Sequence, residues 1–373
     1  MKTQILLACI VLFINNKLIA QQNDLVYTLT SSNERHEEAR TSIITVANSK
    51  WAPLNVLISR KNKGKLNLGY TKQNRPVPLY YFPGKSRQSV LIIGGMHGSE
   101  LSSIELAHSI KKMLGDYELK HDVFLIPSLF PDNAVKALGS GCQSNTGRYS
   151  HEDAVDPNRQ MPAIGKAFNS QQPFDALRRV IEQENQWLLA VIQEYKPILI
   201  INLHAIKDVK KAGVFADPRT DCSGIALGYE KDSLLALQIA AEIKAKEGLL
   251  PGNFLDNAVT TLYHKDPAIA PAGIRQQRNL QGSKLPHKRG EGISLGTWAT
   301  TAVCERTEQN NREAIAVLTI EFPGYKPSSL YNNAEEKAFA LKNIQAYSEG
   351  ILSILQIEPQ EKQDIAGTGA KMK

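Results

Sequence analysis

Residues 89–100 read SVLIIGGMHGSE, and this stretch decides the fold. The apolar run over residues 89–93 is typical of a strand that is buried on both faces. It stops at Gly94 and Gly95, where the absence of a side chain lets the backbone turn sharply. Residues 101–114 then repeat apolar side chains at helical spacing. The stretch therefore predicts a strand, a tight turn and a helix.

Two later apolar runs also lead into polar residues. Residues 198–201 read ILII and lead to His204, and residues 316–320 read AVLTI and lead to Glu321. Further strands are predicted over residues 77–82 and 123–126, and helices over residues 174–195, 232–247 and 333–355. This alternation predicts a single α/β domain with a twisted central sheet, mostly parallel or mixed, and helices on both faces.

The residues at the predicted strand ends share one chemistry. His97, Glu100, His204 and Glu321 supply two imidazoles, a carboxylate ligand and a further glutamate. A catalytic zinc site takes three such protein ligands and keeps a fourth position for water. Taken singly, His97 and Glu100 could be solvated loop side chains and His204 a buried core residue. Glu321 could be a surface residue at the end of its strand or the partner of an arginine. Together they predict one zinc ion at the edge of the sheet where the strands end.

A polar cluster lies between these stretches in the sequence. Residues 155–162 read VDPNRQMP, and Arg148 precedes them. Arginine presents a rigid fork of donors that matches a carboxylate, and asparagine adds a neutral donor, so Asn158 and Arg159 suit the anionic end of a substrate. The alternative is that Arg159 pairs with Asp156 in a structural loop.

These motifs, in this order, resemble the zinc carboxypeptidase family. The resemblance covers residues 66–355 and rests on His97 with Glu100, residues 130–133 (FPDN), residues 156–159 (DPNR), residues 202–204 (NLH) and Glu321. Within the family, residues 292–298 (GISLGTW) most resemble the bacterial murein peptide amidases. Those enzymes cleave the amide between the side-chain carboxyl of D-glutamate and diaminopimelate in cell-wall peptides.

The resemblance implies a role for each site residue. His97, Glu100 and His204 would bind zinc, and Glu321 would be the general base. Arg148 would polarise the scissile carbonyl, and Asn158 and Arg159 would hold the free carboxylate of the substrate. The pocket for the released residue would be lined by Ser294, Leu295, Gly296 and Trp298.

The chain departs from the family pattern in two ways: in residues beside Asn158 and Arg159, the pair predicted to clamp the substrate carboxylate, and in the length of two segments. Asn133 stands where glycine is usual, and Gln160-Met161 stands where Asn-Phe is usual. Added stretches at residues 252–291 and 304–312 would form loops at the rim of the cleft.

The N-terminus predicts export. Residues 1–20 read as a signal peptide, since Lys2 precedes an apolar run and Ala20 offers a small residue for cleavage. The run is too short for a transmembrane anchor, so no stable membrane insertion is expected after cleavage. The predicted order is residues 21–50 as an N-terminal arm, residues 51–357 as the catalytic domain and residues 358–373 as a disordered tail. We expect a periplasmic or secreted protein.

Cysteine content and charge add two constraints. After signal cleavage Cys142, Cys222 and Cys304 remain, which allows at most one disulfide and excludes a cysteine zinc site. The formal net charge of +7 suits anionic partners such as carboxylate-rich muropeptides, although a generically basic exported protein would look the same. Lysine and arginine are scattered and not grouped with aromatic residues, so nucleic-acid binding is not expected. The oligomeric state stays open.

Other functions fit the same motifs. One is a conventional metallocarboxypeptidase that releases C-terminal residues from peptides. Another is a deacylase acting on acyl-amino acids, of the aspartoacylase or succinylglutamate desuccinylase kind, which the resemblance also covers. A non-catalytic wall-binding module is the third alternative, in which the pocket has lost activity.

Overall fold

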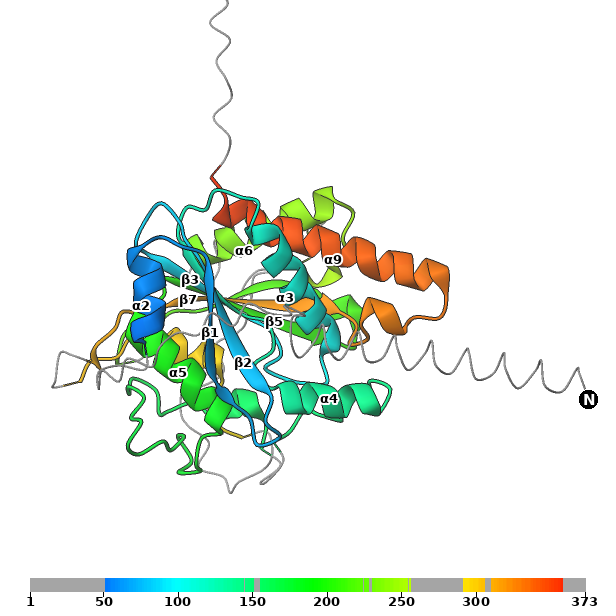
Figure 1. Cartoon of the computed structure of the whole chain (residues 1–373). Helices are drawn as coiled ribbons and strands as arrows, with labels where there is room; N and C mark the ends of the chain where they lie inside the picture. Colours follow the sequence, from blue (N-terminus) through cyan, green and yellow to red (C-terminus); the bar gives the residue numbers. More distant parts are fainter. Residues whose placement is uncertain are drawn as a thin grey trace, which may run out of the picture.

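A seven-stranded sheet forms the centre of the molecule (Figure 1). The computed structural model describes residues 51–357, except for 144, 151–154, 224, 228–229, 254, 256–290 and 306–309. The strands are β1 (Gly64–Tyr70), β2 (Pro76–Phe82), β3 (Ser89–Ile93), β4 (Asp122–Ile126), β5 (Leu199–Ile206), β6 (Gly213–Asp217) and β7 (Ala316–Pro323), in the spatial order β1-β2-β4-β3-β5-β7-β6.

The sheet is mixed, with a parallel centre. Strands β4, β3, β5 and β7 are parallel neighbours, while the pairings toward the two edges, β1 with β2, β2 with β4 and β6 with β7, are antiparallel. The central strands are almost wholly apolar because both of their faces are covered. From β3 the chain moves outward to β4 and then returns to the other side of β3 to form β5. The strand order therefore reverses between β3 and β5, which is where ligands bind in open α/β sheets.

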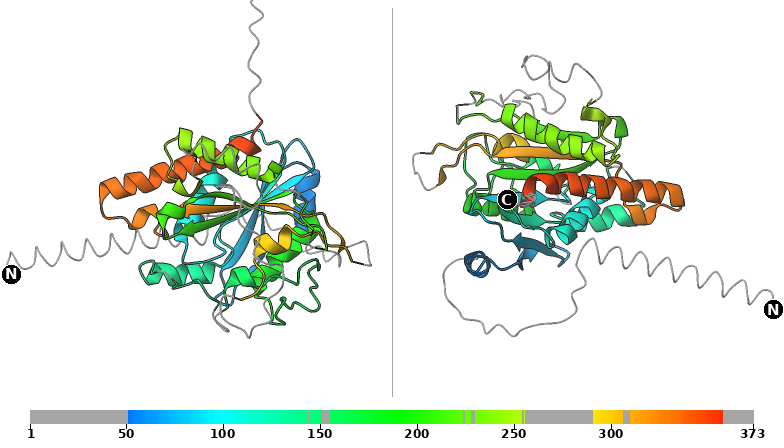
Figure 2. Two further views of the ribbon diagram at one scale, coloured as in Figure 1. Left: turned by 180° about the vertical axis from the view of Figure 1, so that it is seen from behind. Right: turned by 90° about the horizontal axis from the view of Figure 1, so that it is seen from above.

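Two layers of helices cover the sheet (Figures 1 and 2). Side chains from α3 (Leu101–Leu114), α6 (Glu230–Ala245) and α9 (Ala334–Leu355) share one core cluster with the sheet. Side chains from α2 (Ala52–Ser59), α5 (Gln183–Tyr195) and α8 (Leu295–Ala299) form the second core on the opposite face. The predicted single α/β domain with helices on both faces is confirmed.

Helix α4 (Pro131–Gly139) and four short 3₁₀ turns complete the described elements. The turns are η1 (Pro157–Arg159), η2 (Val209–Lys211), η3 (Pro251–Asn253) and η5 (Ser328–Leu330). No helix among the described residues is both long enough and apolar enough to cross a membrane.

One predicted helix begins later than the sequence pattern indicated. Residues 174–195 were expected to be helical throughout, but α5 begins only at Gln183. The carboxylate of Asp175 accepts hydrogen bonds from the backbone N–H groups of Leu177 and Arg179, and Arg178 has a left-handed φ of 66°. An aspartate that bonds to the backbone just after it favours a turn over a helix. The predicted signal, arm, tail and most of the stretch 252–291 lie outside the described residues.

Candidate metal centre

The turn after β3 brings His97 and Glu100 to the reversal in strand order. Gly95 has a φ of +67°, a conformation that glycine adopts without strain. Gly98 lies so close to α4 that a Cβ atom on it would be 2.2 Å from the backbone of Asn133. Glu100 is the residue before the first turn of α3. These constraints hold the short segment 94–100 in one path across the end of the sheet.

His204 reaches the same place from β5. Its neighbours Leu203 and Ala205 point into the core shared with α3, α6 and α9. Because side chains alternate along a strand, His204 points to the opposite face. One ligand atom from each of His97, Glu100 and His204 lies within 4.8 Å of the others, and all three residues are buried. The three stretches predicted to converge do converge.

The carboxylate of Glu100 lies between the two imidazoles. Nδ1 of His97 is 2.9 Å from Oε1 of Glu100, and Nδ1 of His204 is 2.9 Å from Oε2. The backbone N–H of Ala205 also donates to Oε2 at 3.0 Å. Both histidines therefore turn the same ring nitrogen toward a single carboxylate, so the donor atoms face one common point.

Asp156 supports His97 from behind. Nε2 of His97 lies 2.8 Å from Oδ1 of Asp156, so the ring is held between two carboxylates. Ligand histidines commonly bond through their second nitrogen to a carboxylate, which orients the ring. The sequence reading considered Asp156 only as a structural partner of Arg159 and missed this role. The Asp-Pro-Asn-Arg motif was the available signal, but the contact joins residues 59 positions apart.

The charges of this cluster stabilise one another. Burial by itself lowers the pKa of His97, but the carboxylates of Glu100 and Asp156 outweigh burial and raise it to about 9. Burial would raise the pKa of Glu100, yet His97 and His204 hold it well below its usual range. The pKa of Asp156 is also lowered, because its contacts with His97 and Arg148 outweigh burial. Two buried carboxylates thus stay ionised and attract a cation.

Arg148 lies beside the same carboxylates. Its Nη1 donates to Oε1 of Glu100 at 3.2 Å, and its Nη2 donates to Oδ2 of Asp156 at 3.4 Å. Burial disfavours the charged guanidinium, but Asp156 and Glu100 outweigh that effect and raise its pKa. The side chain remains 26% exposed. Arg148 therefore carries a fixed positive charge at the open side of the cluster.

Asn158 and Arg159 adjoin the cluster through the turn η1. The carboxylate of Asp156 accepts the backbone N–H of Asn158 at 2.9 Å and so caps this turn. Nδ2 of Asn158 lies 3.4 Å from Nε2 of His204. Nη1 of Arg159 donates to the carbonyl oxygen of Asn158 at 2.6 Å. The predicted pair therefore lies directly beside a predicted zinc ligand.

Glu321 occupies the strand next to His204. The two residues are paired in the register of β5 and β7. Its neighbours Ile320 and Phe322 belong to the core on the other face, so Glu321 points to the side of the sheet that carries His204. It is half-buried and is not part of the three-residue cluster. This placement suits an acid that acts beside the metal without binding it.

The segment predicted to line the substrate pocket has a different part in the structure. Leu295 and Trp298 are fully buried in the core beneath α8. Ser294 caps this short helix by accepting the N–H of Thr297, and Gly296 packs against the carboxylate of Asp217. Both side chains fill the core here, so a role of Leu295 and Trp298 in lining the pocket stays a prediction. The segment meets the site through the N–H of Leu295, which donates to Oδ1 of Asn158 at 3.0 Å.

Tyr325 is a neighbour of the site that the sequence reading missed. Burial raises the pKa of its phenol, and the charges of Glu100 and Glu321 add to that effect while Arg148 opposes it. The loop that carries Tyr325 is fixed to the start of α3, where the N–H of Ser102 donates to the Tyr325 carbonyl at 3.1 Å. No motif in the sequence indicated this position.

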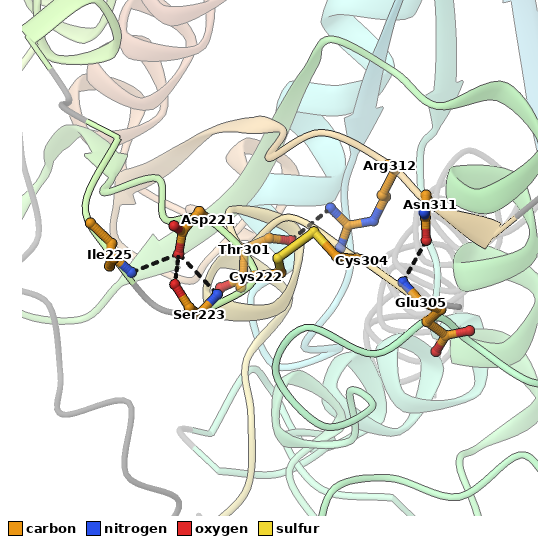
Figure 3. The surroundings of a disulfide bond; sticks show 9 residues. All are labelled: Asp221, Cys222, Ser223, Ile225, Thr301, Cys304, Glu305, Asn311 and Arg312. Atoms are coloured by element: carbon orange, nitrogen blue, oxygen red, sulfur yellow. Dashed lines mark hydrogen bonds between the residues drawn. A yellow bond between two sulfur atoms is a disulfide. The ribbon is translucent and has the colours of Figure 1, made fainter. Parts of the chain in front are cut away.

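A disulfide joins the loop after β6 to the loop after α8 (Figure 3). Cys222 follows β6, and Cys304 follows α8. Backbone hydrogen bonds between Thr220 and the segment 300–302 tie the same two loops together. The guanidinium of Arg312 donates to carbonyl oxygens beside this link, among them that of Thr301. The sequence allowed at most one disulfide, and the structure contains this one, with Cys142 free.

The donor set fits a single zinc ion. Two imidazoles and a carboxylate are the ligands of many catalytic zinc sites, and the second nitrogen of His97 already has its carboxylate partner. The negative charge of Glu100 and Asp156 favours a dication. Soft sulfur ligands are absent from the described cluster. His97, Glu100 and His204 would hold the ion.

Comparison with known proteins agrees with this geometry. Residues 62–211 match the family model described as zinc carboxypeptidase. The matched segment contains His97, Glu100, Arg148, His204 and the Asn-Arg pair, but ends before Glu321. This part of the chain is therefore similar to zinc carboxypeptidases, and its His-Glu-His cluster could hold one metal ion. No curated protein matches the sequence.

Several solved structures match this chain at low identity. Carboxypeptidase A from Helicoverpa armigera matches with 13% identity and a TM-score of 0.45, covering 91% of this chain and 81% of that one. The murein-tripeptide amidase MpaA from Escherichia coli O157 matches with 19% identity and a TM-score of 0.39, covering 76% and 92%. Bovine thrombin-activatable fibrinolysis inhibitor matches with 13% identity and a TM-score of 0.43, covering 82% and 93%.

Proposed function

We propose that this metallopeptidase is exported and hydrolyses an amide next to a free carboxylate, in cell-wall peptides such as those with a γ-D-glutamyl-diaminopimelate bond. The observation that carries the proposal is the position of Asn158, with one side-chain amide atom 3.4 Å from the predicted ligand His204. A carboxylate held by Asn158 and Arg159 would place the adjoining amide beside the metal cluster. Binding and chemistry would then share one small region.

Each residue has a defined part in the proposed reaction. Bound zinc supplies Lewis acidity and lowers the pKa of a water molecule to near neutrality. Glu321 takes a proton from the attacking water and passes it to the leaving amine. Arg148 directs its positive charge at the oxygen where negative charge develops. Arg159 and Asn158 hold the carboxylate and so fix the substrate in an orientation suited to attack.

Four features support export and a wall substrate. Residues 1–20 have the pattern of a signal peptide. The Cys222–Cys304 disulfide is of a kind that persists in oxidising compartments such as the periplasm. The formal net charge of +7 becomes 7 − 2 = +5 once Lys2 and Lys17 are removed with the signal peptide, and this excess and the resemblance of residues 292–298 to murein amidases favour an anionic muropeptide.

The test is a product analysis with purified mature protein. Murein tri- and tetrapeptides, ordinary peptides with free C-termini and acyl-amino acids are incubated with the zinc-loaded enzyme, and the products are identified by mass. Release of diaminopimelate from tripeptide supports the proposal. Release of ordinary C-terminal residues alone would make it a conventional carboxypeptidase, and release of acyl groups alone would make it a deacylase. Zinc retained with no turnover of any substrate would indicate a binding module.

A further inference from the structure

Arg179 joins three separate parts of the chain beside the Asn-Arg pair. Its Nε donates to Oδ2 of Asp175 at 2.6 Å. Its Nη2 donates to the carbonyl oxygen of Arg159 at 2.8 Å and to that of Glu291 at 3.0 Å. The side chain is 14% exposed, and that of Asp175 is 1% exposed. The guanidinium is therefore largely enclosed and satisfied by a carboxylate and two backbone carbonyls.

The carboxylate of Asp175, which accepts a hydrogen bond from the Arg179 guanidinium, is itself held in place. The carboxylate of Asp175 accepts the backbone N–H groups of Leu177 and Arg179 at 2.9 and 2.8 Å. The same turn is closed by the backbone N–H of Asp175, which donates to the carbonyl oxygen of Arg179 at 2.9 Å. Asp175 thus cannot rotate without breaking the turn. A rigid, planar guanidinium held this way places the two N–H donors of its Nη2 at defined points.

The two carbonyls that Arg179 joins belong to adjoining backbone segments. Gln160 and Ile293 form a parallel bridge, and the N–H of Met161 donates to the carbonyl of Ile293 at 3.2 Å. At Gly292 a Cβ atom would lie 2.1 Å from the carbonyl oxygen of Arg159. The backbone of the clamp therefore lies against residues 291–293, and Arg179 holds the two together at the position of Arg159 itself.

We propose that Arg179 is a positioning residue for the substrate carboxylate. It holds the backbone of Arg159 in place, and this backbone sets the direction in which the Arg159 side chain leaves the turn. Arg179 does not touch the substrate. The inference rests on the proposed function, since it presumes that Arg159 binds a carboxylate.

The experiment compares two substrates that differ only in that carboxylate. One is a murein tripeptide, and the other is the same peptide with the carboxylate beside the scissile amide converted to a carboxamide. The ratio of their kcat/KM values measures recognition of the carboxylate and cancels losses in the amount of active enzyme. In Arg159→Met the ratio should fall by about 30-fold, because the charged donor is lost. In Arg179→Met it should fall by about tenfold, mostly through KM, because the donor is misplaced.

A matched control lies at the opposite end of the sheet. Nζ of Lys61 likewise joins a buried carboxylate and a backbone carbonyl, those of Asp122 and Gly84, at 2.9 and 3.1 Å. Lys61→Met removes a similar set of contacts at the amino-terminal end of β4, away from the metal cluster. Its substrate ratio should stay within about twofold of the wild type. All variants should retain one zinc ion per chain.

The outcomes separate the two proposals. If Arg159→Met lowers the ratio while Arg179→Met behaves like Lys61→Met, the positioning role is wrong and the proposed function stands. If Arg159→Met leaves the ratio unchanged, the clamp is wrong and the inference falls with it. Should Arg179→Met fail to fold, Arg179→Lys and Asp175→Asn replace it. Arg179→Lys, which keeps a charged donor, should recover part of the ratio, and failure of both variants to lower it would overturn the inference.

Discussion

His204 and Glu321 occupy paired positions on the adjacent parallel strands β5 and β7, and both point to the same face of the sheet. Register alone thus places the proposed base next to a metal ligand. His204 belongs to the buried three-residue cluster, whereas Glu321 does not. In the proposed mechanism, this strand pairing places the residue that would bind zinc directly beside the residue that would transfer a proton.

The first prediction concerns this separation. Glu321→Gln keeps the size and polarity of the side chain but removes the base, so kcat should fall by about 10²- to 10⁴-fold. Zinc content, measured by atomic emission, should remain one per chain. His204→Ala should lose both zinc and turnover. A zinc-free Glu321→Gln protein would contradict the assigned roles, because it would make Glu321 a ligand.

The second prediction tests the support that Asp156 gives to His97. Asp156→Asn removes the negative partner of Nε2 while preserving its shape, so zinc affinity should fall by about 10- to 100-fold. Competition with a chromophoric chelator measures this change. Asp208→Asn, at a half-exposed carboxylate of an ion pair outside the cluster, is the control. Equal zinc affinity in the two variants would show that Asp156 does not orient His97.

The third prediction concerns pH and Glu184, near the start of α5. Burial raises the pKa of Glu184 from 4.5 to about 7. The folded state then binds a proton that the unfolded state has released, so stability is full below pH 4.5 and falls as pH rises through about 7. The loss should reach about 3 kcal/mol at most. Glu184→Gln should flatten this part of the curve, measured by urea unfolding at pH 5 and pH 8. A variant with the same pH dependence as the wild type would refute the assignment.

The fourth prediction concerns the disulfide. Cys222 and Cys304 are 82 residues apart, so their bond closes a long loop. Reduction should lower the free energy of unfolding by about 2–4 kcal/mol, mainly because the unfolded chain gains freedom. Unfolding of the Cys222→Ser, Cys304→Ser double variant should match that of the reduced protein. Cys142→Ser should respond to reductant as the wild type does, and an unchanged midpoint on reduction would contradict the expectation.

Local sequence patterns were sufficient to predict the strand and helix that flank His97 and Glu100. Strand β3 and helix α3 have the bounds that the apolar patterns predicted, since a buried parallel strand and an amphipathic helix depend on their own residues. The pattern over residues 174–195 failed at its start, because Asp175 bonds to the backbone after it and holds a turn. The motif over residues 292–298 likewise did not show that Leu295 and Trp298 fill the core, because their burial depends on the elements packed around α8.

The sequence by itself determined the chemistry: two histidines and a glutamate for zinc, a further glutamate and an Asn-Arg pair, each placed at the end of an apolar run or in a polar turn. Only the tertiary structure decided which of them meet and what holds them. Asp156 reaches His97, Arg179 reaches Arg159, and Cys222 reaches Cys304 because strand order and register bring distant segments together. Such contacts depend on the path of the whole backbone, and the spacing of residues along the sequence does not show that path.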